Sequence, residues 1–221
     1  MSKAGSISDV AGGALAGAAA PPAAAHDADT GRVGPNAVIQ LAAALRAQGH
    51  AALARDVFTE CGHGAWLDAP PRDMVDERAV ARLHQAVRAA LPEVEARAVM
   101  REAGRRTADY LLANRIPKPV QAVLKLLPAL PAAFILVAAI RKNAWTFAGS
   151  GQFAAHTGRP VIFDITGNPF CAGERAASPV CVWHEAVFER LFQALVAPRA
   201  TARETVCEAS GADVCRFEVA W

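Results

Sequence analysis

The hydrophobic pattern changes along this chain of 221 residues, and the change constrains the fold more than any other feature. Up to about residue 140 the apolar residues recur at helical spacing, whereas much of the remainder alternates between apolar and polar residues as strands do. Residues 202–207 and 214–219 alternate on either side of Ser210-Gly211-Ala212-Asp213, which predicts a terminal β-hairpin. We therefore expect an α+β fold, in which N-terminal helices pack on a small antiparallel sheet that ends in this hairpin.

Caps, prolines and periodicity divide the helical part into segments. Helices are predicted over residues 36–48 and 50–60, from Asp73 or Asp76 to about 91, from Pro92 to about 116, over 120–140 as one or two helices bent at Pro128 and Pro131, and from Ser178-Pro179 to 196. Strands are predicted over residues 144–147 and 160–165. Gly104 lies in the middle of one predicted helix, which indicates a close backbone approach there.

Composition limits the number of domains and the classes of function. Residues 1–34 are rich in Ala, Gly and Pro and offer few large side chains to bury, so we expect a disordered tail followed by one domain over 35–221. The net charge of +2 gives no field that would favour nucleic acid. The longest apolar run, residues 126–140, contains two prolines and is shorter than the ~20 residues of a membrane span, so it is either a core segment or a surface-lying one.

Three of the five cysteines suggest a metal site. Cys181 opens a predicted helix, while Cys207 and Cys215 lie on the predicted hairpin, and thiolates brought together from two elements can close a tetrahedral metal cage. The alternative is that the three are buried small hydrophobes. His184 competes as a ligand because it lies three residues after Cys181 on one helix face. Cys171, in a Pro- and Gly-containing turn, is either a spare thiol or a ligand.

The C-terminal part resembles a known family. The stretches Asn168-Pro169-Phe170-Cys171-Ala172-Gly173, Ser178-Pro179-Val180-Cys181, Glu204-Thr205-Val206-Cys207 and Gly211-Ala212-Asp213-Val214-Cys215-Arg216-Phe217 are similar to motifs of the 4-vinyl reductase domain family. The resemblance implies a fold similar to a vesicle-tethering subunit that buries an acyl chain, and hence a fold able to enclose apolar ligands. It also implies a role in bacteriochlorophyll biosynthesis.

In sensor members of that family, zinc is held by a Cys from the helix and by a Glu and two Cys from the hairpin. The resemblance therefore implies a structural zinc site made of Cys181, Glu204, Cys207 and Cys215. Residues 204 and 207 differ by an odd number and would face opposite sides of a regular strand. A β-bulge near Thr205 would bring both to one side.

Aromatic and basic side chains cluster where helices give way to strands. A flat macrocycle with propionates would use aromatic faces for stacking, cations for its carboxylates and an imidazole for magnesium. The alternative is that Trp145 and Phe147 belong to the core and that Arg141 and Lys142 form a solvated helix end. The candidate tetrapyrrole-binding residues are Phe134, Arg141, Lys142, Trp145, Phe147, Phe153 and His156.

Two functions follow from the resemblance. The first is a tetrapyrrole-binding protein that binds magnesium porphyrin or chlorophyllide intermediates and presents them to pathway enzymes. The second is a vinyl reductase that acts on divinyl (proto)chlorophyllide, and whether the chain is an enzyme stays open. Gly149-Ser150-Gly151-Gln152-Phe153-Ala154 is a weak G-x-G-x-x-A match without room for the helix that a dinucleotide site requires, so we expect no NADPH site.

The partners and location are expectations of the same kind. The pathway suggests magnesium chelatase and the following methyltransferase as protein partners, and relatives suggest a homodimer. An odd number of cysteines favours a reducing compartment, so we expect a cytoplasmic protein that is peripheral to the photosynthetic membrane.

Overall fold

The computed structural model describes residues 31–221 of the chain. The predicted tail, residues 1–34, lies almost wholly outside the described residues. Within the described part, Arg32–Val33 forms strand β1, which pairs antiparallel with β2 (Val75–Asp76).

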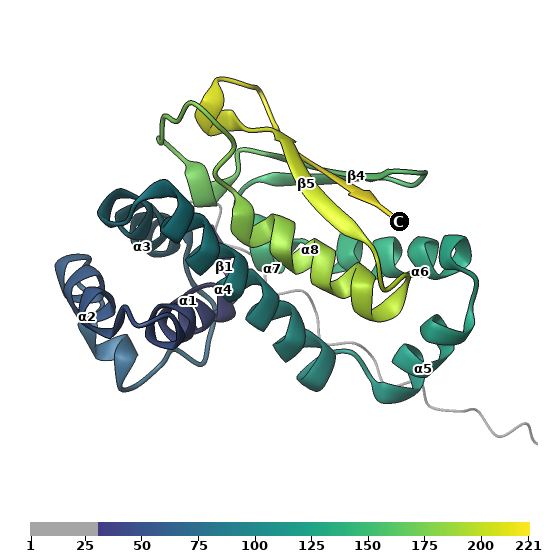
Figure 1. The fold of residues 1–221 in the computed structure, drawn as a ribbon, viewed down its shortest axis with the longest axis horizontal. Coiled ribbons are helices and arrows are strands. Elements are labelled where there is room, and N and C mark those ends of the chain that lie inside the picture. The colour runs from purple at the N-terminus through teal and green to yellow at the C-terminus, as the bar shows by residue number, and fades with distance from the viewer. Residues whose placement is uncertain (1–30) are drawn as a thin grey trace, which may run out of the picture.

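Helices make up most of the N-terminal part, and strands and one long helix make up the C-terminal part (Figure 1). The α-helices are α1 (Asn36–Ala47), α2 (Ala51–Glu60), α3 (Glu77–Ala90), α4 (Glu93–Asn114), α5 (Lys118–Leu126), α6 (Ala129–Lys142), α7 (Trp145–Ala148) and α8 (Val182–Leu195). The main sheet is antiparallel, in the order β3 (Gln152–His156), β4 (Val161–Thr166), β6 (Cys215–Ala220) and β5 (Thr201–Val206). The α+β class, the antiparallel sheet and the C-terminal hairpin are thereby confirmed.

Helix α8 is the centre of the fold because it packs on the sheet with one face and on α4 with the other (Figure 1). Gly104 of α4 lies at the crossing, where an added Cβ would be 2.3 Å from the backbone oxygen of Trp183 and 2.8 Å from the Cβ of Ala186. The predicted close approach is therefore correct. The core beneath α8 is aromatic, and Phe163, Phe188, Phe192 and Phe217 are fully buried in it.

Some predicted elements hold and others do not. The carboxylate of Asp76 caps α3 by accepting a hydrogen bond from the Arg78 N–H at 2.8 Å, and Pro128 divides residues 120–140 into α5 and α6 as expected. The predicted strand over residues 144–147 is wrong, because these residues continue the helical path as α7 and the strand β3 starts only after Gly149 and Gly151. Helix α8 begins at Val182 rather than Ser178, since Cys181 is its N-cap residue.

Candidate metal centre

Four buried cysteines meet between the sheet and the N-terminus of α8. Cys171 ends a 3-10 turn (Pro169–Cys171), Cys181 is the N-cap of α8, Cys207 follows β5, and Cys215 is the first residue of β6. The four sulfur atoms all lie within 4.8 Å of one another, and none of them is in a disulfide. Such a group can hold a metal ion.

The sulfur–sulfur distances match a tetrahedral cage. Cys171 and Cys215 are 3.6 Å apart, Cys207 and Cys215 are 3.7 Å apart, and Cys181 lies 3.8 Å from Cys215 and 3.9 Å from Cys207. Four ligands at about 2.3 Å from a central ion, the bond length of thiolate to zinc, lie about 3.8 Å apart at the corners of a tetrahedron. The thiols are thus spaced for a metal without any movement of the backbone.

Hydrogen-bond donors surround the sulfurs. The Asn168 side-chain N–H donates to Cys181 Sγ at 3.4 Å, and the Glu208 backbone N–H donates to Cys215 Sγ at 3.5 Å. Cys181 also lies at the N-terminus of α8, where the helix dipole stabilises negative charge. These interactions offset part of the charge that four thiolates would bring around a divalent ion.

The turn that carries Cys171 is fixed from one side by Glu208. Both carboxylate oxygens of Glu208 accept backbone hydrogen bonds, from Gly167 N at 2.6 Å and from Asn168 N at 2.8 Å. The side-chain oxygen of Asn168 in turn accepts from Phe170 N at 3.1 Å. Asn168 and Glu208 therefore position two of the four cysteines, and sequence reasoning missed both. The Asn-Pro turn was a signal for Asn168, whereas nothing in the sequence connects Glu208 with this turn.

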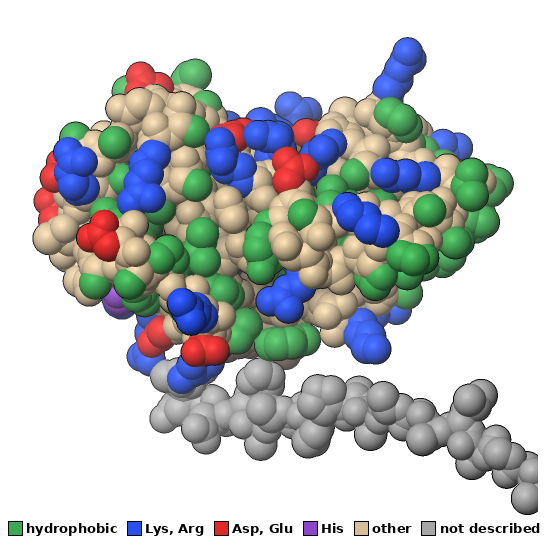
Figure 2. All heavy atoms as spheres, turned by 90° about the horizontal axis from the view of Figure 1, so that it is seen from below, with side chains coloured by type: hydrophobic (Ala, Val, Ile, Leu, Met, Phe, Trp, Pro, Cys, Tyr) green, Lys and Arg blue, Asp and Glu red, His purple; other side chains and the backbone are tan. Residues whose placement is uncertain are grey.

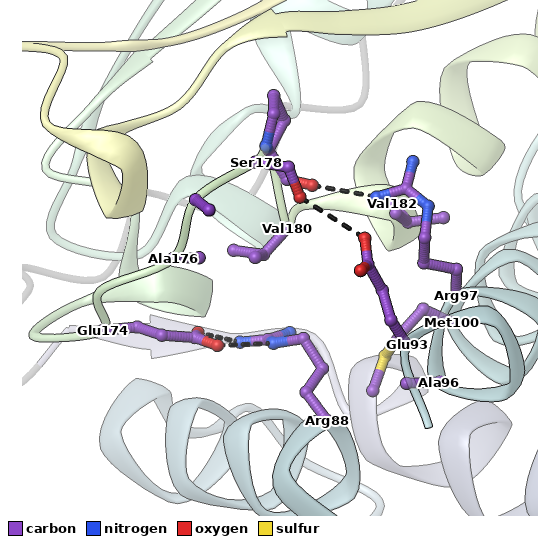
Figure 3. Close-up of a pocket in the computed structure, with 12 residues that line it drawn as sticks. Arg88, Glu93, Ala96, Arg97, Met100, Glu174, Ala176, Ser178, Val180 and Val182 are labelled. Atoms are coloured by element: carbon purple, nitrogen blue, oxygen red, sulfur yellow. Dashed lines mark hydrogen bonds and ion pairs between the residues drawn. The ribbon is translucent and has the colours of Figure 1, made fainter. Parts of the chain in front are cut away.

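Arg88 of α3 fixes the same turn from the opposite side. Its guanidinium donates to the Phe170 backbone oxygen at 2.9 Å and pairs with the Glu174 carboxylate, so it binds the chain on both sides of Cys171. Figure 3 shows this pair at the edge of a cavity of about 250 Å³ beneath residues 174–180, the segment that leads to Cys181. Arg97 also fixes that segment, by donating to the Pro179 oxygen at 2.9 Å.

Glu204 lies beside the four thiols and outside their group. The register of β5 and β6 shifts between Glu204 and Val206, which is the predicted irregularity near Thr205. The shift turns the Glu204 side chain inward, where its Oε2 accepts a hydrogen bond from Cys181 N at 2.7 Å. Burial, followed by the nearby Cys207, raises the pKa of Glu204 to about 8. In this geometry Cys171 supplies the fourth ligand atom, the place that the family resemblance gives to Glu204.

His184 is likewise outside the group of four. Its ring lies fully buried among aromatic rings, including Phe170 at a centroid distance of 4.4 Å and Phe217 at 5.6 Å. Burial lowers the pKa of His184 to about 3. Cys61 is also separate, since it packs at the edge of the helical part.

The thiols titrate as a set. Hydrogen bonds from Cys171 and Cys181 lower the pKa of Cys207, while the pKa of Cys181 is raised, chiefly by hydrogen bonding to the neighbouring thiols and by burial. One thiolate thus forms readily within the group, and a bound cation would favour ionisation of the others.

The predicted tetrapyrrole residues lie on three consecutive elements, α6, α7 and β3, but in two environments. Phe147 and Phe153 pack edge to face at 5.3 Å on the aromatic core, as the alternative interpretation expected for Phe147. Phe134 and Trp145 are about half exposed, at 52% and 48%.

The polar members of the set lie at the surface. Arg141 and Lys142 are exposed at the end of α6, and Arg141 donates to the Ala155 oxygen of β3 at 2.6 Å. His156 is exposed, and its Nε2 lies 3.7 Å from the Asp164 carboxylate, which also binds Arg216 through two hydrogen bonds of 2.8 Å. The exposed members therefore form an open surface of aromatic and cationic groups.

Comparisons with known proteins fit this geometry. Residues 161–220, which include three of the four clustered cysteines in their C-terminal part and Cys171 near their start, match the model of the 4-vinyl reductase domain. The chain is 47% identical over 199 residues to the bacteriochlorophyll synthase 23 kDa chain of Cereibacter sphaeroides, covering 90% of this chain and 92% of that one. The chain belongs to the bacteriochlorophyll synthase 23 kDa chain family. The resemblance to the 4-vinyl reductase domain family is thereby confirmed.

A second family member and one solved structure are also similar. The bacteriochlorophyll synthase 23 kDa chain of Rhodobacter capsulatus is 40% identical over 191 residues, which are 86% of this chain and 87% of the relative. The crystal structure of an H-NOX protein from S. oneidensis covers 85% of this chain and 98% of its own, at a TM-score of 0.48 and 14% identity.

Proposed function

We propose that this protein takes part in bacteriochlorophyll biosynthesis as a tetrapyrrole-binding protein, which binds magnesium porphyrin or chlorophyllide intermediates and presents them to pathway enzymes. Membership of the bacteriochlorophyll synthase 23 kDa chain family supports the pathway. The observation that supports binding is the open surface on α6 and α7, where Phe134 and Trp145 are half exposed next to Arg141 and Lys142. Aromatic faces can stack on a macrocycle, and the two cations can bind its propionates.

An open surface suits transfer better than storage. A ligand held there keeps one face accessible to a second protein, whereas an enclosed pocket buries most of its ligand. Magnesium chelatase and the following methyltransferase are the partners we propose, and a location at the surface of the photosynthetic membrane belongs to the same proposal. None of the helices within residues 31–221 has the length and apolar character that crossing a bilayer requires.

We assign zinc to the four-cysteine group. Four thiolates at tetrahedral spacing are typical of structural zinc sites, which leave no position open for a substrate. A metal there joins the 3-10 turn before residue 172, the start of α8 and the hairpin, so it would stabilise the fold and would take no part in chemistry on a ligand.

The segment around Gly149 argues against the reductase alternative. Gly149 and Gly151 are followed by strand β3, whereas a dinucleotide fingerprint places a helix N-terminus there to bind the pyrophosphate. Gly151 is enclosed by backbone, since an added Cβ would be 2.6 Å from the Gly167 oxygen. The glycines therefore serve the turn between α7 and β3.

The surface site can be tested with substitutions that leave the core alone. Magnesium protoporphyrin binding, followed by tryptophan quenching and by the visible spectrum, should weaken about tenfold or more in a Phe134→Ala variant and in an Arg141→Gln/Lys142→Gln variant. The matched control, Arg55→Gln, removes an exposed charge from α2 and should bind as the parent does. Equal affinity in all four proteins would contradict this site.

A further inference from the structure

Helices α5 and α6 expose apolar side chains that the fold leaves uncovered. On α5 these are Val120, Val123 and Leu126, which are 43%, 55% and 87% exposed. On α6 they are Leu130, Phe134 and Ile135, which are 45%, 52% and 46% exposed. Both helices also bury residues on their inner sides, such as Leu124 and Leu136. They are therefore apolar on two faces, and only the inner one is covered within the described chain.

The apolar side chains have a basic surround without any acidic residue. Between Asp109 and Asp164 the sequence has no Asp or Glu, and it has six basic residues: Arg115, Lys118, Lys125, Arg141, Lys142 and Arg159. Figure 2 shows the result at the right-hand end of the molecule, where green apolar and blue basic side chains gather and no red ones appear. We call the exposed residues of α5 and α6 together the α5–α6 face.

We propose that the α5–α6 face docks on the surface of an anionic lipid bilayer. Apolar side chains on helices that lie in the membrane plane enter the boundary between headgroups and acyl chains, while flanking lysines and arginines bind the anionic headgroups. Both features are present here on two neighbouring helices. Neither helix is long enough to cross the membrane, since α5 has 9 residues and α6 has 14.

Charge makes a bilayer a better occupant than a second copy of this chain. In a two-fold dimer through this face, the same patch would meet itself, so lysines and arginines would oppose lysines and arginines with no acidic residue to pair them. An anionic lipid surface supplies the opposite sign and accepts the apolar side chains at the same time.

The proposal is tested by flotation of the full chain with vesicles. We expect binding to vesicles of phosphatidylglycerol and phosphatidylcholine, and at least tenfold weaker binding to phosphatidylcholine alone. Each lysine near such a surface contributes about fivefold to the partition constant, so Lys118→Gln/Lys125→Gln should weaken binding about 25-fold. The control variant Arg55→Gln/Arg72→Gln removes two exposed charges at the other end of the molecule and should bind as the parent does.

A second pair of variants tests the apolar contribution. Leu126→Asp should reduce binding more than tenfold, whereas Val94→Asp changes an equally exposed side chain, 81% against 87%, and should have no effect. Position 94 lies in the first turn of α4, where an acidic residue suits the helix dipole, so the control should fold.

Three results would overturn the proposal. They are absence of binding to either kind of vesicle, equal binding by the α5 variants and their controls, and a dimer in ultracentrifugation that Leu126→Asp dissociates while the parent ignores vesicles. All substitutions are on α5 or distant from it, outside the proposed tetrapyrrole residues. Lipid docking can therefore fail while tetrapyrrole binding holds, and the reverse.

Discussion

Replacing Cys207 with serine should remove the metal from this protein and lower its stability. Cys207 is fully buried, and its sulfur lies 3.9 Å from that of Cys181 and 3.7 Å from that of Cys215, so no other side chain can take its corner of the tetrahedron. A ligand present at a thousand times its dissociation constant stabilises a fold by about 4 kcal/mol. For a domain of this size each kcal/mol shifts the melting temperature by about 2–4 °C, which gives a decrease of about 8–16 °C.

The assay is metal analysis together with calorimetry, each with and without a chelator. The parent should contain one zinc per chain and lose the stated stability on chelation, while Cys207→Ser should contain none and melt near the chelated parent. Cys61→Ser is the control, because Cys61 lies outside the group of four. Equal metal content in the parent and Cys207→Ser, with melting temperatures that do not respond to chelator, would refute the metal centre.

Three further predictions follow from the geometry. Cys171→Ser should lose zinc whereas Glu204→Gln should keep it, and metal analysis showing the reverse would return Glu204 to the ligand set. Gly104→Ala should lower the free energy of unfolding in urea by about 1–3 kcal/mol or more, since its Cβ meets the Trp183 backbone, which cannot move aside; an unchanged midpoint would contradict this packing. Burial lowers the pKa of His84 to about 3, so the unfolded chain binds one proton more between about pH 6.5 and 3, and acidification should reduce stability by about 1.4 kcal/mol per pH unit. That slope should be smaller in His84→Gln, and an identical slope would be inconsistent with a neutral buried imidazole.

Local signals predicted most of the fold. The turn residues of the hairpin, the Asp76 cap, Pro128 and the close approach at Gly104 each act within a few residues of chain or by one steric rule, and the structure has all four. The failure at residues 144–147 has a physical reason. A short run with two aromatic residues satisfies helix and strand patterns equally, and the helical path of α6 decided between them.

The site was predicted less completely because it depends on contacts between distant segments. The three thiols could be selected by spacing, but Cys171 could not be separated from a spare thiol before the turn was placed in space. Arg88 and Glu208 fix that turn from 82 and 41 residues away in the chain, through Phe170 and Gly167. No periodicity or motif encodes such pairs, so only the folded chain identifies them.

The measurement that tests the central claim most directly is an anaerobic titration of the purified protein with a divinyl magnesium tetrapyrrole, followed by absorbance and fluorescence before and after addition of NADPH. We predict a saturable spectral shift that NADPH leaves unchanged, as expected of a protein that binds and presents the pigment. Conversion of the divinyl spectrum to the monovinyl spectrum without other proteins would contradict the account and identify the chain as a reductase. A spectrum that does not respond to the protein would contradict tetrapyrrole binding itself.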